Sequence, residues 1–234
     1  MHLLAFDTSC PISAVAVAHD AQLLAEDCSE SELRHGDVLL PRIQAVLQAG
    51  AVKLAALELV VVGVGPGSFT GLRIGLSTAK GLALATGVAL RGVCSLQVLA
   101  RGLAEQAMPA AVVVDAGKGE VFVAVYECSG DVLCCLLAPR MALPEDAARS
   151  IAALGLREVV LCGTGARRHF TSMTVLLGPG ARLCEPAFDL PQGRHVAEAG
   201  RLAWLADGPS DLATLEPTYL RGADAKLPGT PLAL

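Results

Sequence analysis

The segment Gly65–Gly71, with the sequence GPGSFTG, is the part of the chain best suited to hold an anion. It follows an apolar run, Leu59–Val64, that is typical of a buried strand. A helical pattern then runs to about Ala85, with Thr70 as its expected N-cap and Gly87 just past its end. A glycine loop between a strand and a helix gathers backbone N–H groups at the positive end of the helix dipole. The same glycines would also allow close packing of strand and helix, so both interpretations stay open.

This loop carries neither of two common nucleotide-binding motifs. A P-loop requires Gly-x-x-x-x-Gly-Lys-Ser/Thr, but the nearby Lys80 lies well inside the predicted helix. The dinucleotide-binding motif requires Gly-x-Gly-x-x-Gly, and its third glycine position is taken by Thr70. The candidate residues that remain for a nucleotide or another anion are Asp7, Gly67, Ser68, Thr70 and Gly71.

Two aspartates, Asp7 and Asp115, end strand-like apolar segments at corresponding places in the two halves of the chain. A carboxylate at such a turn can hold a metal ion or a water molecule beside a phosphate. It can also close an Asx-turn by accepting hydrogen bonds from local N–H groups. We expect the Asx-turn at Asp115 and leave both roles open for Asp7.

Patterns for nucleophilic or metal chemistry are absent. Ser68 is not part of a Gly-x-Ser-x-Gly sequence. The five histidines are scattered, and the eight cysteines form no Cys-x-x-Cys pair, so we expect neither a zinc site nor any other metal site. The cysteines are expected to be reduced and mostly buried, with Cys134 and Cys135 inert in an apolar stretch. We therefore expect no catalytic residue, and a peptidase is the least favoured function.

The elements that must position these residues alternate between strands and helices. Beside the strand and helix around the glycine loop, the first half of the chain predicts strands at Leu3–Phe6, Ile12–Val17, Gln22–Glu26 and Leu90–Val93, and helices at about Leu33–Ala49 and Ser95–Gln106. Ser29 and Glu32 have the spacing of a capping box before the earlier helix. Pro41 predicts either a kink in that helix or the start of a second one.

The second half repeats the order of strand, acidic turn and hairpin. Strands are predicted at Ala111–Asp115, Val121–Cys128 and Val159–Cys162, helices at Pro144–Leu154 and Pro191–Ala206, and irregular structure beyond Asp207. With a boundary at Met108-Pro109, we predict an α/β protein of two lobes, 1–107 and 108–234, each a mixed sheet with flanking helices. For the last helix, about 191–206, two placements stay open: within the second lobe, or packed back on the first lobe.

Composition narrows the possible functions. Apolar residues make up 53% and charged residues 18% of the 234, which suits either a large α/β core or apolar surface kept for a partner. No apolar run predicts a membrane span, and the amino terminus lacks the pattern of a signal peptide, so we expect a cytoplasmic protein. The net charge of −5, with Arg167-Arg168-His169 as the densest basic run, argues against independent binding of nucleic acid.

Four segments carry a resemblance to a known family. The string GPGSFTGLRIGLSTAKGLA at Gly65–Ala83 resembles the signature of bacterial tRNA threonylcarbamoyladenosine biosynthesis proteins of the TsaB (YeaZ) type. LAFDTS at 4–9, RH with LLP at 34–41, and DAGKGEVF at 115–122 are similar to other parts of that family. The resemblance covers positions 3 to about 125 and thins over the carboxy-terminal third.

The resemblance implies a two-lobed actin/Hsp70-like fold and a non-catalytic role. It implies a scaffold in the complex that forms N6-threonylcarbamoyladenosine at position 37 of tRNAs reading ANN codons. The expected partners are the catalytic subunit TsaD and the ATPase TsaE, with self-association as a homodimer and only indirect contact with tRNA. The chain would have no cofactor of its own, because ATP and a divalent metal act in the partner subunits.

The lack of a second histidine one helical turn after His35 distinguishes this chain from the catalytic TsaD family. The TsaD family binds its metal through two histidines one helical turn apart, whereas here His35 is followed four residues later by Leu39. The alternative function is a nucleotide-dependent ATPase or sugar-kinase-like enzyme of the same fold, with Asp7, Gly67–Gly71 and Gly163–Gly165 around the nucleotide.

The resemblance also implies an interface for the partner or a second copy on the first two helices. The later of these helices is rich in glycine and alanine, and each interior glycine costs a helix about 1 kcal/mol, which close packing of another helix would offset. The expected interface residues are Leu39, Leu40, Ile43, Leu47, Leu72, Arg73, Leu76, Ser77, Ala79 and Lys80.

Overall fold

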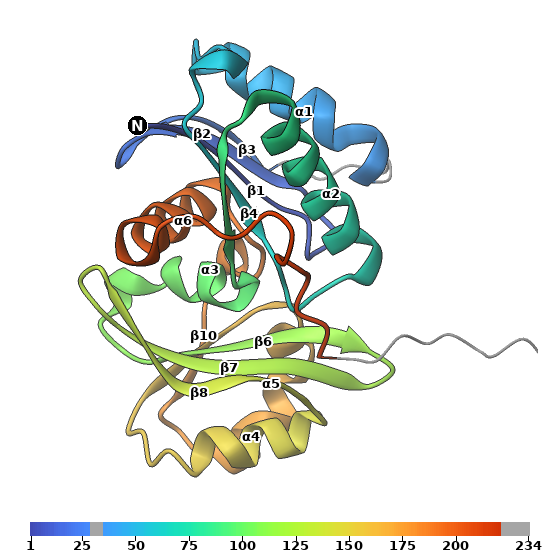
Figure 1. Cartoon of the computed structure of the whole chain (residues 1–234). Coiled ribbons are helices and arrows are strands. Elements are labelled where there is room, and N and C mark those ends of the chain that lie inside the picture. The colour runs from blue at the N-terminus through green and yellow to red at the C-terminus, as the bar shows by residue number, and fades with distance from the viewer. Residues whose placement is uncertain (29–34, 221–234) are drawn as a thin grey trace, which may run out of the picture.

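Two five-stranded sheets, seen one above the other in Figure 1, organise the chain. The computed structural model describes residues 1–28 and 35–220. The predicted capping box of Ser29 and Glu32, and the tail from residue 221 onward, lie outside the described residues.

The first sheet has the order β3-β2-β1-β4-β5. Its strands are β1 (His2–Asp7), β2 (Ala14–His19), β3 (Gln22–Asp27), β4 (Leu59–Gly63) and β5 (Ala89–Val93). β1 pairs antiparallel with β2 and parallel with β4, which makes the sheet mixed. The continuous apolar runs of β1 and β4 suit central strands that are covered on both faces.

The second sheet repeats this topology with the order β10-β9-β6-β7-β8. Its strands are β6 (Ala110–Gly117), β7 (Glu120–Ser129), β8 (Val132–Ala142), β9 (Val159–Cys162) and β10 (Ala181–Leu183). β6 pairs antiparallel with β7 and parallel with β9, as β1 does with β2 and β4. The prediction of two lobes with mixed sheets is therefore confirmed, and the repeated order indicates an internal duplication.

Helices cover the outer faces of both sheets (Figure 1). α1 (His35–Ala49) and α2 (Phe69–Thr86) pack on the first sheet, and α4 (Pro144–Ala152) and α5 (Thr164–Leu177) pack on the second. Short 3-10 turns lie at Leu54–Ala56, Ala104–Gln106 and Pro186–Phe188. These helices thus cover the outer faces of the parallel strand pairs in both sheets.

The remaining two helices lie between the sheets, and each packs on the sheet formed by the other half of the chain (Figure 1). α3 (Ser95–Arg101) follows the first sheet in sequence, but it packs on β6 and β7 of the second. α6 (Gly193–Asp207) follows the second sheet, but it packs on β1 and β2 of the first. The predicted division of the chain into lobes 1–107 and 108–234 stays a prediction.

Close approach of α6 to the first sheet depends on a glycine. A Cβ atom added at Gly200 would lie 2.2 Å from a methyl carbon of Val61 on β4. Val61 is fully buried, so the closely packed core between α6 and β4 has no free space for a larger side chain at position 200.

Several element ends differ from the prediction. α2 begins at Phe69 with Ser68 as its N-cap, not Thr70, because the Ser68 hydroxyl oxygen accepts the Gly71 N–H at 3.2 Å. Gly87 ends this helix in the left-handed conformation with φ of 72°, as predicted. Pro41 lies inside one continuous helix, and α3 ends at Arg101, several residues before the predicted end.

The segment 208–219 after α6, which we call the strap, has no regular structure but is held in place. It runs beside β5, the edge strand of the first sheet. The Ser210 N–H donates to the Leu90 carbonyl at 2.8 Å, and the Thr218 N–H donates to the Val64 carbonyl at 2.7 Å. Leu212 and Leu215 of the strap pack on the core beneath α2.

None of the helices within residues 1–28 and 35–220 has the length and apolar character needed to cross a lipid bilayer.

Two glycine-to-alanine changes test the packing of the central helix. Gly200→Ala should lower the free energy of unfolding by about 1 to 3 kcal/mol, because the added methyl group overlaps Val61. Gly81→Ala is the matched control on α2, where nothing lies within 4 Å of the added atom, and it should stabilise the protein by about 0.5 to 1 kcal/mol. Urea unfolding gives both values, and an equal response of the two variants would contradict the packing described here.

Candidate functional site

The carboxylate of Asp7 lies at the centre of a buried network at the end of β1. Its Oδ1 accepts the Ser9 N–H at 2.7 Å, and its Oδ2 accepts the Ser95 hydroxyl at 2.6 Å. The Ser95 oxygen in turn accepts the Gly65 N–H at 3.1 Å. The network joins β1, the glycine loop and the start of α3, and Asp7 is 0% exposed.

The glycine loop packs directly on the two residues that follow Asp7. The Ser68 N–H donates to the Ser9 carbonyl at 2.7 Å, and the Thr8 hydroxyl donates to the Gly71 carbonyl at 2.7 Å. A Cβ atom at Gly71 would lie 2.0 Å from the Thr8 carbonyl oxygen, and one at Gly67 would lie 2.5 Å from that of Ser9. Glycine is therefore required at both positions for close backbone approach.

Of the two interpretations of this loop, the geometry favours close packing. Both carboxylate oxygens of Asp7 accept hydrogen bonds from the chain, and the side chain is 0% exposed, which favours a structural role; its role as a metal or phosphate residue stays a prediction. Ser68 and Thr70 are exposed, but the Ser68 side chain caps α2. Gly71 and also Gly75 approach Thr8, so these helix glycines serve packing within the chain and not against another helix.

The second lobe repeats the turn at Asp115. Its Oδ1 accepts the Gly117 N–H at 2.7 Å, which confirms the expected Asx-turn, and its Oδ2 accepts Arg168 Nη1 at 2.7 Å. Partial burial acts to raise the pKa of Asp115, but these two hydrogen bonds and the Arg168 charge hold it below its ordinary value. Gly163 lies close to the Val113 carbonyl and Gly165 close to the backbone of Asp115, so these glycines also serve packing.

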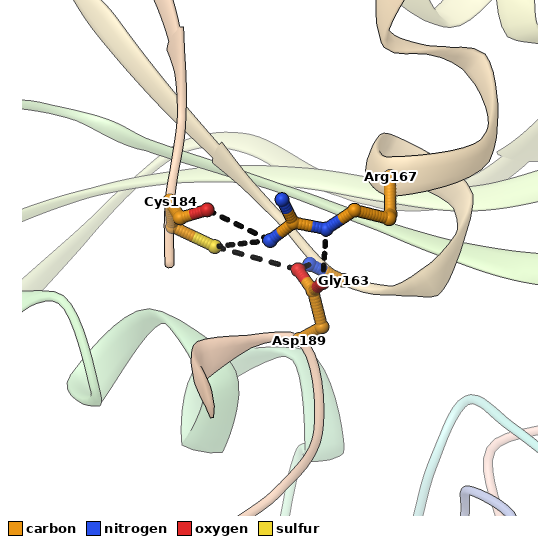
Figure 2. Close-up of polar contacts among 4 residues, drawn as sticks. All are labelled: Gly163, Arg167, Cys184 and Asp189. Atoms are coloured by element: carbon orange, nitrogen blue, oxygen red, sulfur yellow. Dashed lines mark hydrogen bonds and ion pairs between the residues drawn. The ribbon is translucent and has the colours of Figure 1, made fainter. Parts of the chain in front are cut away.

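A second polar cluster, missed by the sequence analysis, joins the end of β10 to α5 (Figure 2). Asp189, 7% exposed, accepts Arg167 Nε at 2.6 Å and the Gly163 N–H at 3.0 Å. Arg167 Nη2 also donates to the Cys184 carbonyl at 2.7 Å. Burial and the Asp189 charge raise the pKa of the Cys184 thiol to about 12, so the thiol stays protonated. The cluster fixes the chain before α6 and has no reactive group.

The predicted interface residues divide into two groups. Six side chains are buried in the core beneath α1 and α2, and of these only Leu76 also lines the groove described below: Leu39, Ile43, Leu47, Leu72, Leu76 and Ala79. Leu40 is 57% exposed, Arg73 and Ser77 are exposed, and Lys80 is half-buried. The second group therefore provides most of the surface that this face offers to another protein, and the interface itself stays a prediction.

A groove of about 410 Å³ lies between α2 and the strap. Arg73, Leu76, Ser77 and Lys80 line it from α2, and Leu215, Glu216, Pro217 and Tyr219 line it from the strap. The α2 residues of this groove are among the predicted interface residues, whereas no local pattern indicates the strap, because residues 73 and 219 are brought together only by the fold.

Other expected sites give no reactive cluster. Cys134 and Cys135 are exposed on the edge strand β8, and three of the eight cysteines are buried, so the expectation of mostly buried cysteines is wrong. β8 has a sheet neighbour on one side only, which leaves both side chains open to solvent. Within the described residues no three His, Cys, Asp or Glu side chains gather as a metal site would need. His35 begins α1, and Leu39, one turn later, is buried.

A family model described as TsaD, tRNA N6-adenosine threonylcarbamoyltransferase, matches residues 29–169, which is more than half of the chain. The chain belongs to this family. Within it the chain is of the TsaB (YeaZ) type, as its relatives show. TsaB of Bacillus subtilis is 26% identical over 226 residues, which cover 97% of this chain and 96% of that protein.

Two further comparisons bear on the family and the fold. The structure of YeaZ from Pseudomonas aeruginosa superposes with a TM-score of 0.77 at 27% identity and covers 94% of this chain and 99% of that one. A hexokinase of the ROK family from Thermus thermophilus has a TM-score of 0.50 at 13% identity, covering 88% of this chain and 99% of that one. The expected actin-like fold of two lobes is thereby confirmed.

One curated mycobacterial relative is longer than this chain. An uncharacterized protein of Mycobacterium leprae is 31% identical over 228 residues, which cover 96% of this chain but 56% of that protein. The chain thus spans a little over half the length of this relative.

Removal of one hydroxyl group tests the network around Asp7. Ser95→Ala should lower the free energy of unfolding by about 1 to 3 kcal/mol, because the Asp7 carboxylate and the Gly65 N–H each lose a buried partner. Ser77→Ala, on the exposed side of α2, is the matched control and should change stability by less than about 0.5 kcal/mol. Equal midpoints of chemical unfolding for the two variants would show that the network does not stabilise the fold.

Proposed function

We propose that this chain is a non-catalytic subunit of the assembly that forms N6-threonylcarbamoyladenosine at position 37 of tRNAs reading ANN codons. In this role it binds and organises the TsaD-type catalytic subunit. The relatives from Escherichia coli and Bacillus subtilis are named tRNA threonylcarbamoyladenosine biosynthesis protein TsaB, which supports the pathway. The match to the TsaD family model supports an evolutionary link with the catalytic subunit.

The bonding of Asp7 is the observation that carries the non-catalytic role. In an enzyme of this fold, a carboxylate at this turn would face a metal ion or a water molecule beside the phosphates. Here both carboxylate oxygens accept hydrogen bonds from the chain itself, and the side chain is 0% exposed. The glycine loop closes over the same place by direct backbone contact. The turn therefore holds the lobes together instead of holding a ligand.

The other components of the proposed assembly supply the chemistry that this chain lacks. TsaE joins it as the ATPase, and ATP and a divalent metal act in the partner subunits. This chain contacts tRNA only through the complex, resides in the cytoplasm and pairs with itself through the same face of α1 and α2 when TsaD is absent.

Reconstitution with purified proteins tests this function. We expect modified tRNA only when this chain is combined with the TsaD and TsaE proteins of the same organism, as measured by mass spectrometry of the digested tRNA. The chain alone should neither modify tRNA nor hydrolyse ATP, because Asp7 is not available to a ligand. ATP turnover by the isolated chain would favour the sugar-kinase-like alternative and contradict the proposal.

A charge placed on α1 tests the face used for assembly. Leu40 is 57% exposed on this helix, so Leu40→Glu should leave the fold intact but weaken association with TsaD at least about tenfold, because a buried unpaired carboxylate is costly. Val175→Glu is the matched control, since Val175 is 81% exposed on α5 of the other lobe. Size-exclusion chromatography with light scattering measures the complex. Equal binding by the two variants would exclude α1 from the interface.

A further inference from the structure

The groove between α2 and the strap holds two cationic side chains. Arg73 and Lys80 lie two helical turns apart on one face of α2, with Ser77 between them. Across residues 1–28 and 35–220, neither side chain forms an ion pair with a carboxylate, and Glu216 of the same groove forms none either. The groove thus places two positive charges close together on a protein of net charge −5.

Aromatic contacts hold the Arg73 guanidinium in one place. Its carbon atom lies 4.0 Å from the centre of the Phe69 ring, a cation–π contact, and its Nε donates to the Tyr219 hydroxyl at 3.1 Å. The two rings lie 5.1 Å apart. These contacts use one face and one N–H of the guanidinium and leave its terminal nitrogens to face an incoming group. Because these contacts already hold the guanidinium in place, less side-chain conformational entropy is lost when an anion binds.

The groove suits a protein segment better than a free anion. Its floor is apolar, with Leu76 of α2 and Leu215 of the strap, and the exposed Phe69 and Tyr219 rings lie at one end. Glu216 repels a multiply charged small anion more strongly than it repels a single carboxylate, and the apolar floor offers contact to an apolar side chain beside that carboxylate. The groove also continues the α2 face assigned to partner binding.

We propose that this groove receives an acidic, partly apolar segment of the partner protein, with an aspartate or glutamate of the partner bound between Arg73 and Lys80. The strap then forms half of the binding surface, so the interface extends from the two helices to the chain's last described residues. This inference rests on the proposed function, because the partner is the TsaD-type subunit.

The experiment compares charge-neutral variants in the complex with the TsaD protein of the same organism. Arg73→Gln and Lys80→Gln should each weaken binding about three- to tenfold at low salt. Both should also reduce the dependence of the affinity on salt, because fewer ionic contacts are screened. Arg157→Gln is the matched control, since it removes one exposed arginine from the other lobe and should change neither quantity. Titration calorimetry at several salt concentrations measures both.

A direct readout comes from a carbodiimide, which joins an amine to an adjacent carboxylate without a spacer. Treatment of the complex should link Lys80 to an aspartate or glutamate of the partner, as identified by mass spectrometry of the digested product. The wild-type link at this position should disappear in Lys80→Gln and persist in Arg157→Gln.

The outcomes separate the two proposals. If the wild-type complex forms and all variants bind with equal affinity and equal salt dependence, the groove is not the binding site, whereas the proposed function stands. If the wild-type chain does not bind TsaD, the proposed function fails and this inference fails with it. Binding of inorganic phosphate by the isolated chain, abolished in both variants, would show a site for small anions and overturn the inference of a protein ligand.

Discussion

The buried carboxylate of Asp7 is the constraint on which the arrangement of the two lobes depends. A charge without exposure to solvent persists in a protein only if hydrogen bonds satisfy it. Ser9 provides one donor from the turn after β1, and Ser95 provides the other from the start of α3. Since α3 packs on the second sheet, this carboxylate joins the core of one lobe to a helix in the core of the other.

The same constraint explains the glycine loop. The turn after Asp7 is covered by the loop before α2, and the two backbones approach so closely that a Cβ atom at Gly71 has no space. A sequence typical of anion binding here serves contact between two backbones. An actin-like fold that elsewhere surrounds a nucleotide is thus compatible with a chain whose corresponding turn is filled by its own atoms.

Local signals in the sequence predicted most of the fold. The apolar runs of β1, β4 and β6, with Asp7 at the end of β1 and Asp115 near the end of β6, were sufficient to indicate two similar lobes. β8, α5 and β10 were missed because they lack a clear apolar period: β8 is an edge strand that contains Pro139, and α5 is largely polar. The exposure of Cys134 follows from the edge position of its strand, which the order of residues does not reveal.

The candidate sites were less predictable because their members are far apart in sequence. Ser95 reaches Asp7 across 88 positions, and Tyr219 reaches Arg73 across 146. No spacing rule brings such residues together, so the strap was described only as irregular.

The exchanged helices α3 and α6 also set how the molecule can be divided. A cut near residue 107 would leave each half with a helix suited to the opposite sheet and with one face of its own sheet bare. Neither half is then a self-sufficient folding unit, because each sheet depends on a helix from the other half of the chain. Cooperative unfolding of the whole chain, and not of separate lobes, is the behaviour that this architecture imposes.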